Sequence, residues 1–278
     1  CSDLHALTGR NVTLLRRRDW QLRPSAAASR SWEHQRLAAL YAMARGEAPL
    51  VVAAIDAAVQ RCVPESVLLE SAVTMKTGES YPVETLTARL TAAGYVRCQQ
   101  VEGPGQFALR GGILDVFSPA MEQPVRCEFW DDELDAMGAF DVTTQRRVHN
   151  LNETLLLPAG EVLPFRTADT AEKAAAALEA AAKKLKRKAD AQPLLRQLES
   201  DANALRQGIA PNGSDRYLAA VYPEKTTALD YLPENAIVCV CEGGRVSEGL
   251  KGWLWQLKED VSAAAENGFM APVMGELA

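Results

Sequence analysis

The sequence predicts an α/β protein in which one domain is interrupted by a smaller, largely antiparallel α+β domain rich in strands. Three observations support this class. The amino-terminal part alternates strand and helix, the middle has short strands separated by glycine and proline, and helical periodicity returns after Pro164. At roughly 150 residues per domain, a chain of 278 residues has the length of about two domains. We expect residues 1–68 and 163–278 to form the α/β domain and residues 69–162 to form the inserted domain.

The composition excludes several classes of protein. The chain is 47% hydrophobic and 24% charged, as globular domains usually are. It has no run of about 18 apolar residues and no secretory signal in its first twenty residues, so we expect a cytoplasmic protein with no membrane partner. A formal net charge of -6 disfavours a globally basic nucleic-acid-binding protein, although it leaves room for a local basic patch. We expect a monomer.

The amino-terminal elements alternate between strand and helix. Residues 11–15 predict a short strand, and residues 31–43 predict a helix because their apolar positions recur at helical spacing. Residues 49–55 are almost continuously apolar, which predicts a strand buried on both faces of a parallel sheet. A short helix is expected over residues 56–60. This order is that of a strand–helix–strand unit.

The central stretch predicts a helix followed by hairpins. The helix is expected over residues 82–93 and ends before Gly94, a residue type that commonly follows the last turn of a helix. Five short strands separated by glycine and proline are then predicted at residues 95–101, 107–110, 112–117, 125–130 and 136–141. Strands of this length with such short connections are typical of an antiparallel sheet.

The carboxy-terminal part is predicted to be mostly helical. Residues 169–207 are rich in Ala, Lys, Glu and Leu, with leucines spaced as an apolar stripe. A turn is expected at Asn212 and Gly213. The remaining predicted elements are strands over residues 217–222 and 236–240 and a helix over residues 253–267.

The cysteines favour reduced thiols over a disulfide framework, because the six of them are irregularly spaced in a chain without a secretory signal. Cys239 and Cys241 fall at the predicted strand over residues 236–240, so we expect them to be core thiols. A metal-ligand pair would need two intervening residues and a second pair elsewhere. The three histidines show no matching spacing, so neither a metal site nor a Cys/His or Ser/His/Asp catalytic group is expected. A catalytic thiol enzyme is an alternative without a supporting base.

The segment with the strongest functional signal contains two arginines and a tryptophan. A pair of glycines permits a tight turn directly after Arg110. On the predicted strand over residues 125–130, Arg126, Glu128 and Trp130 share one face, and the alternate residues form a core face. An exposed arginine about 13 Å from an aromatic side chain is typical of a protein-interaction hot spot. The alternative is an Arg126–Glu128 ion pair with Trp130 lying over it.

A basic run and an acidic run each have two interpretations. The basic run comprises Lys183, Lys184, Lys186, Arg187 and Lys188. It is either a solvated helix face or a patch that contacts the phosphates of nucleic acid. The acidic run over residues 131–133 could imitate a metal-binding box, but it lies at a predicted hairpin tip. We interpret it as a solvated turn and expect no metal.

Three blocks of this sequence resemble the UvrB-like module of the bacterial transcription-repair coupling factors, the Mfd family. They are residues 105–117, 124–135 and 140–146. Their order and spacing are more specific than any single block. The resemblance covers most of the chain and is strongest over residues 90–160 and weakest over residues 165–215. It implies a degenerate, helicase-like α/β domain interrupted by a β-rich domain.

The resemblance implies a protein-recruitment module in DNA repair. In that family, the β-rich domain docks UvrA, the damage-recognition protein of nucleotide excision repair, and so couples a stalled RNA polymerase to repair. The family's docking residues match Arg110, Arg126 and Trp130, the last standing where phenylalanine is common. An arginine fork can pair with a carboxylate of the partner, and a tryptophan can fill a pocket on it.

The resemblance also implies that the motor of the intact protein lies outside this chain. Whole family members are ATP-dependent DNA translocases that act on RNA polymerase and double-stranded DNA. This chain has no Gly-x-x-x-x-Gly-Lys-Ser/Thr loop, so we expect no catalytic residue here, with ATP and Mg²⁺ bound only by the parent's motor domains. Because the chain starts at Cys1, we expect a fragment that begins inside the first subdomain. The alternative function is direct DNA or nucleotide binding, supported only by the basic run.

Overall fold

The chain folds into two compact units, one of which interrupts the other along the sequence. One unit comprises residues 1–65 and 167–278, and the second comprises residues 66–166. This mixed α/β architecture with an inserted antiparallel sheet confirms the predicted fold class. The computed structural model describes residues 1–18, 30–185, 192–211 and 213–267.

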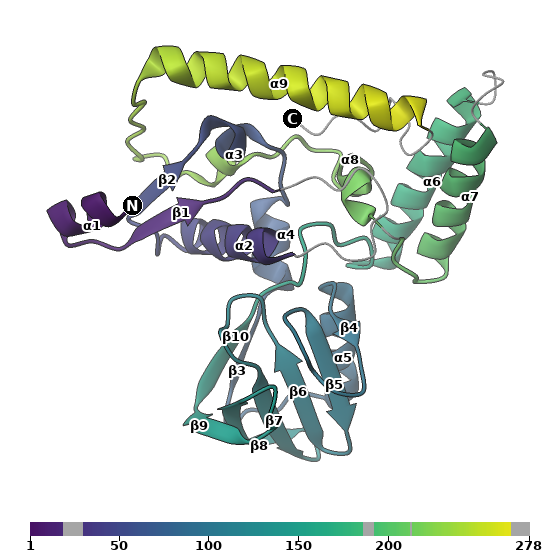
Figure 1. The fold of residues 1–278 in the computed structure, drawn as a ribbon. Coiled ribbons are helices and arrows are strands. Elements are labelled where there is room, and N and C mark those ends of the chain that lie inside the picture. Colours follow the sequence, from purple (N-terminus) through teal and green to yellow (C-terminus); the bar gives the residue numbers. More distant parts are fainter. Residues whose placement is uncertain (19–29, 186–191, 212, 268–278) are drawn as a thin grey trace. The chain divides into compact units, whose positions relative to one another are not determined.

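The interrupted unit contains a two-stranded parallel sheet and most of the helices (Figure 1). Strands β1 and β2 pair along their whole length. Its elements are α1 (Ser2–Thr8), β1 (Val12–Leu15), α2 (Ser31–Ala44), β2 (Leu50–Ala53), α3 (Ile55–Val59), α6 (Ala168–Leu185), α7 (Gln192–Arg206), η2 (Ser214–Tyr217), α8 (Leu218–Val221), η3 (Ala228–Tyr231) and α9 (Gly243–Glu266). Helix α4 (Glu65–Ser71) runs across the border into the second unit.

Backbone carbonyls join the two parts of this unit. The Arg61 Nη2 donates to the carbonyl oxygens of Tyr222, at 2.9 Å, and Glu224, at 2.8 Å. The Tyr231 hydroxyl donates to the Val63 carbonyl oxygen at 2.7 Å. Segments on either side of the insertion are therefore packed into one folded unit.

The leucine stripe predicted for residues 169–207 is also confirmed, because the leucines at positions 178, 185, 195 and 198 are buried.

The predicted strand over residues 217–222 is wrong, since these residues form the end of η2 and helix α8. Its buried residues are Tyr217, Leu218, Val221 and Tyr222. That spacing places them on one side of a helical turn, whereas a strand would bury alternate positions.

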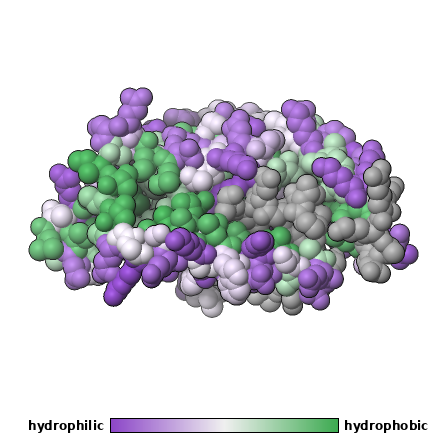
Figure 2. All heavy atoms as spheres, turned by 90° about the horizontal axis from the view of Figure 1, so that it is seen from above, coloured by the Kyte–Doolittle hydropathy of each residue, from purple (hydrophilic) through white to green (hydrophobic). Residues whose placement is uncertain are grey.

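Two predictions of buried strands in this unit are also wrong. Residues 236–240 form no strand, and Ile237 is 90% exposed. Cys239 and Cys241 are accordingly exposed rather than core thiols. Strand β2 is only partly buried, because in the described part of the chain β1 is its one strand neighbour. The face that carries α9 shows exposed apolar side chains among hydrophilic ones (Figure 2).

The inserted unit is built on a six-stranded sheet in the order β4-β5-β6-β7-β8-β9, antiparallel except where β4 pairs with β5. Strands β3 and β10 form a separate antiparallel pair. The elements are β3 (Val73–Lys76), α5 (Val83–Ala92), β4 (Val96–Arg97), β5 (Gln106–Arg110), β6 (Ile113–Phe117), β7 (Val125–Trp130), β8 (Glu133–Phe140), β9 (Arg147–Leu151) and β10 (Glu153–Leu156). The strand predicted over residues 95–101 is reduced to β4.

The larger core cluster of this unit lies on the face of the six-stranded sheet where α5 packs (Figure 1), and a smaller one, which includes Phe117 and Phe140, lies on the other face. Leu86 and Leu90 of α5 contact a cluster that includes Val125 and Cys127 of β7. The predicted core face of residues 125–130 is therefore confirmed, and the alternate residues of β7 lie on the opposite face of the sheet. Within the described residues, no helix of either unit is long and apolar enough to cross a membrane.

Candidate protein-docking site

Three neighbouring strands of the inserted unit bring two arginines and one aspartate together. Arg110 pairs with Ile113 across a two-residue turn that closes the β5–β6 hairpin. Gly111 in this turn has a φ of 60°, in the left-handed region that favours glycine. Asp115 on β6 lies directly opposite Arg126 on β7. The tight turn and the strand register therefore place both arginines beside one carboxylate.

Asp115 binds both arginines through its two carboxylate oxygens. Arg126 donates from Nε to Oδ1 at 2.7 Å and from Nη2 to Oδ2 at 2.9 Å. Arg110 donates from Nη2 to Oδ2 at 2.8 Å. The Asp115 side chain is only 1% exposed. A buried carboxylate is tolerated where charged donors satisfy it, and here three nitrogen donors do so.

Arg126 is held from several sides. Its Nη1 donates to the Gln145 carbonyl oxygen and its Nη2 to the Gln145 Oε1, both at 3.3 Å. Its guanidinium carbon lies 4.6 Å from the centre of the Phe140 ring, within the range of a cation–π contact. Hydrogen bonds to Asp115 raise the pKa of Arg126 above its usual value. Arg126 is thus a largely enclosed cation, with 21% of its side chain exposed.

Trp130 is the most exposed member of the predicted set, with 82% of its surface accessible. It ends β7, next to a hairpin turn in which Asp131 has a φ of 56°. The turn is tied to the start of α5, because Asp132 accepts the Val83 N–H at its carboxylate, at 3.2 Å, and the Tyr81 N–H at its carbonyl, at 2.7 Å. The acidic run is therefore a hairpin turn, and no group of potential metal ligands is found among the described residues.

The alternative ion pair between Arg126 and Glu128 is wrong, because Glu128 bonds Arg147 of β9 instead. Gly138, on the strand between β7 and β9, makes room for this contact. A Cβ there would lie 2.6 Å from the His149 carbonyl oxygen and 3.0 Å from the Arg147 Cδ. The site therefore has a second Arg–carboxylate pair beside the first.

Sequence reasoning missed Asp115, which joins the two predicted arginines. The signal was present, since one aspartate interrupts the otherwise apolar strand Ile113–Phe117. A charged residue in such a run is either exposed at the sheet surface or buried with partners. The choice between them depends on which strands lie on either side, which the local pattern does not state.

The basic run is only partly described by the structure. Lys183 and Lys184 are exposed near the end of α6, and Lys186, Arg187 and Lys188 lie outside the described residues.

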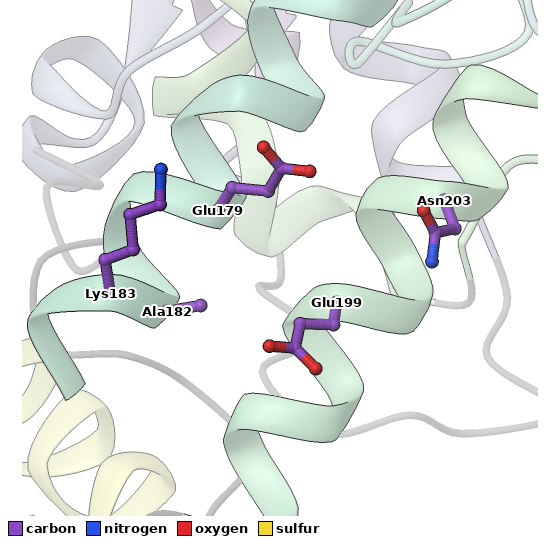
Figure 3. Close-up of a pocket in the computed structure, with 5 residues that line it drawn as sticks. All are labelled: Glu179, Ala182, Lys183, Glu199 and Asn203. Atoms are coloured by element: carbon purple, nitrogen blue, oxygen red, sulfur yellow. The ribbon is translucent and has the colours of Figure 1, made fainter. Parts of the chain in front are cut away.

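Acidic side chains surround the described end of the basic run. Lys183 lines a hollow of about 380 Å³ between α6 and α7, together with Glu179, Ala182, Glu199 and Asn203 (Figure 3). Hydrogen bonds from Arg206 lower the pKa of Glu179 and keep it ionised. Two carboxylates beside Lys183 oppose phosphate binding at this hollow, so nothing in it favours the nucleic-acid alternative over a solvated helix face.

Comparisons with known proteins match this region to one family. A family model described as the UvrB interaction domain matches residues 73–161. The transcription-repair-coupling factor of Bacillus subtilis (strain 168) is 32% identical over 225 residues, which are 80% of this chain and 19% of that protein. The factor of Myxococcus xanthus is 31% identical over 251 residues, 88% of this chain and 20% of that protein.

A third relative agrees over a shorter stretch. The transcription-repair-coupling factor of Escherichia coli (strain K12) is 34% identical over 148 residues, which are 51% of this chain and 13% of that protein. The chain thus spans a fifth or less of the length of these relatives. Together with the inserted antiparallel sheet, these matches show that the chain belongs to the family of transcription-repair coupling factors and corresponds to their UvrB-like module.

Proposed function

We propose that this chain is the part of a transcription-repair coupling factor that docks UvrA, and that Arg110, Arg126 and Trp130 form the docking surface. The observation that carries the proposal is that Arg110 and Arg126 meet on Asp115, on the same strand face as the exposed Trp130, within a matched UvrB interaction domain. The larger core cluster covers the opposite face of this sheet. On the arginine face a smaller buried cluster includes Ala108, Phe117 and Phe140, and the exposed Arg110 and Trp130 are the side chains open to a partner.

The chemistry of the surface favours a partner with a carboxylate beside an apolar pocket. Arg110 is 51% exposed, and it uses only Nη2 in its hydrogen bond to Asp115 among the residues that the structure describes. Its other nitrogens are available to an acceptor on another protein. Trp130 offers a large apolar surface with little conformational freedom to lose, which is typical of interface anchors.

The proposal is tested by titrating UvrA with the chain and with Arg110→Ala. We expect the substitution to weaken binding about ten-fold or more, because a charge-assisted hydrogen bond to a partner is lost. Arg89→Ala is the matched control, since Arg89 is exposed on α5, which covers the core side of the sheet. Equal affinity of Arg110→Ala and the unchanged chain would contradict the site, and absence of UvrA binding by the unchanged chain would contradict the function.

We further propose that the complete protein is an ATP-dependent DNA translocase of the bacterial cytoplasm that acts on RNA polymerase and double-stranded DNA. The support is that its relatives, which are about five times the length of the matched region, are transcription-repair-coupling factors. DNA-stimulated ATP hydrolysis and release of stalled RNA polymerase by the complete protein would test this. Arg110→Ala in that protein should keep both activities and lose UvrA recruitment, whereas loss of all three would place Arg110 outside a dedicated docking role.

A further inference from the structure

Asp115 is the one carboxylate that the two arginines of the docking surface share. The Arg126–Asp115–Arg110 group spans three adjacent strands, since Asp115 lies opposite Ala108 on β5 and opposite Arg126 on β7. Within the described residues, the side-chain donors to Asp115 all come from these two arginines. Its 1% exposure means that no partner protein can reach it directly.

The two arginines differ in how much of their hydrogen-bonding capacity is already used. Arg126 bonds Asp115 through Nε and Nη2 and bonds Gln145 through Nη1, so each of its three nitrogens has an acceptor. Arg110 is more than twice as exposed, at 51% against 21%. Among the residues that the structure describes, its Nη2 has Asp115 as acceptor, and its Nε and Nη1 have no acceptor.

We propose that Asp115 is a positioning residue, which holds the Arg110 guanidinium so that its unused N–H groups face a carboxylate of the docked protein. Arg126 is the counter-charge that holds the buried Asp115 in place. This inference rests on the proposed UvrA docking and adds which residue orients the arginine that meets the partner. It also assigns the class of the partner group, because a planar guanidinium held at one edge pairs best with a carboxylate.

A purely electrostatic role for this surface predicts the opposite result when Asp115 loses its charge. Two arginines and one aspartate leave a net charge of +1 on the group, and Asp115→Asn raises it to +2. If attraction to an acidic partner were the whole contribution, this substitution would strengthen binding and speed association. If Asp115 positions Arg110, the same substitution weakens binding although the surface becomes more positive.

The test is a thermodynamic cycle on UvrA binding with the full chain, Asp115→Asn, Arg110→Ala and the double substitution. We expect Asp115→Asn to weaken binding about ten-fold, which corresponds to ~1.4 kcal/mol, and to have no further effect once Arg110 is alanine. Unchanged or tighter binding by Asp115→Asn would overturn the inference. So would a loss that persists in full beside Arg110→Ala, because Asp115 would then act without Arg110.

A second variant tests the idea without touching the buried carboxylate. Arg110→Lys keeps the charge, but a compact ammonium has no planar, two-donor edge to pair with a carboxylate of the partner. We expect it to weaken UvrA binding as much as Arg110→Ala does, and wild-type affinity would overturn the inference.

Urea unfolding of each variant is the control, because it identifies losses of UvrA binding that come from unfolding of the chain. If Arg110→Ala and Trp130→Ala both bind UvrA normally, the proposed docking site itself fails. If only Asp115→Asn and Arg110→Lys bind normally, the docking site stands and the positioning role fails.

Discussion

Replacing Trp130 with alanine separates the proposed docking role of this side chain from any role in folding. A tryptophan side chain buries about 200 Å² in a protein interface, and with 82% of Trp130 exposed about 160 Å² of that remains to be covered by a partner. At ~25 cal/mol per Å², covering it contributes up to about 4 kcal/mol. Part of this is offset by the ordering of both surfaces, so we expect a loss of about 2–4 kcal/mol, roughly 30- to 1000-fold in affinity.

The assay is a calorimetric titration of UvrA with the full chain, paired with urea unfolding. Because Trp130 contributes little buried surface, Trp130→Ala should change the free energy of unfolding by less than about 0.5 kcal/mol. Trp255→Ala is the matched control, since Trp255 is 63% exposed on α9 of the other unit. Affinity within two-fold of the unchanged chain for Trp130→Ala would refute the anchor role. An equal loss for Trp255→Ala would show that the effect is not specific to this surface.

Two further substitutions and two treatments test the structure of the chain. Arg126→Ala removes the main partner of a buried carboxylate and should lower the free energy of unfolding by about 3–5 kcal/mol in urea, and an unchanged midpoint would contradict the buried ion pair. Gly138→Ala places a Cβ 2.6 Å from the His149 carbonyl oxygen, so thermal unfolding should show a loss of about 1–3 kcal/mol, whereas wild-type stability would mean that the strand shifts freely. Burial raises the pKa of the Cys127 thiol to about 12, so the neutral thiol is favoured in the fold and the free energy of unfolding falls as pH rises above about 9. Mass spectrometry after alkylation at pH 8 should find Cys239 modified in the folded chain and Cys127 modified only in urea, and early modification of Cys127 would disprove its burial.

Much of the inserted unit follows from local patterns. The alternation of residues 125–130 identified the core face of β7 and the opposite face that carries Arg126 and Trp130. The paired glycines after Arg110 predicted the turn between β5 and β6, which the register confirms. Such features depend on residues within one strand or one turn, so they can be predicted without knowing which other strands or helices pack against them.

Predictions failed where the outcome depended on distant parts of the chain. Strands β9 and β10 were not expected. The residues of β9 are largely exposed and it forms by pairing with β8, whereas β10 is only four residues long and forms by pairing with β3. Residues 236–240 have the composition of a buried strand, yet no strand of the described chain pairs with them. An apolar run specifies a tendency to be covered, and only the tertiary structure decides whether a neighbour is present.

The sequence by itself determined the fold class, the hairpin turn at Arg110 and the strand face that carries Arg126 and Trp130. Only the tertiary structure decided that Asp115 joins the two arginines and that Glu128 belongs to Arg147 instead. The physical reason is that side-chain periodicity is set within one strand, whereas the pairing of charges is set by strand order and register across the sheet. Those depend on contacts between residues that are far apart in the chain.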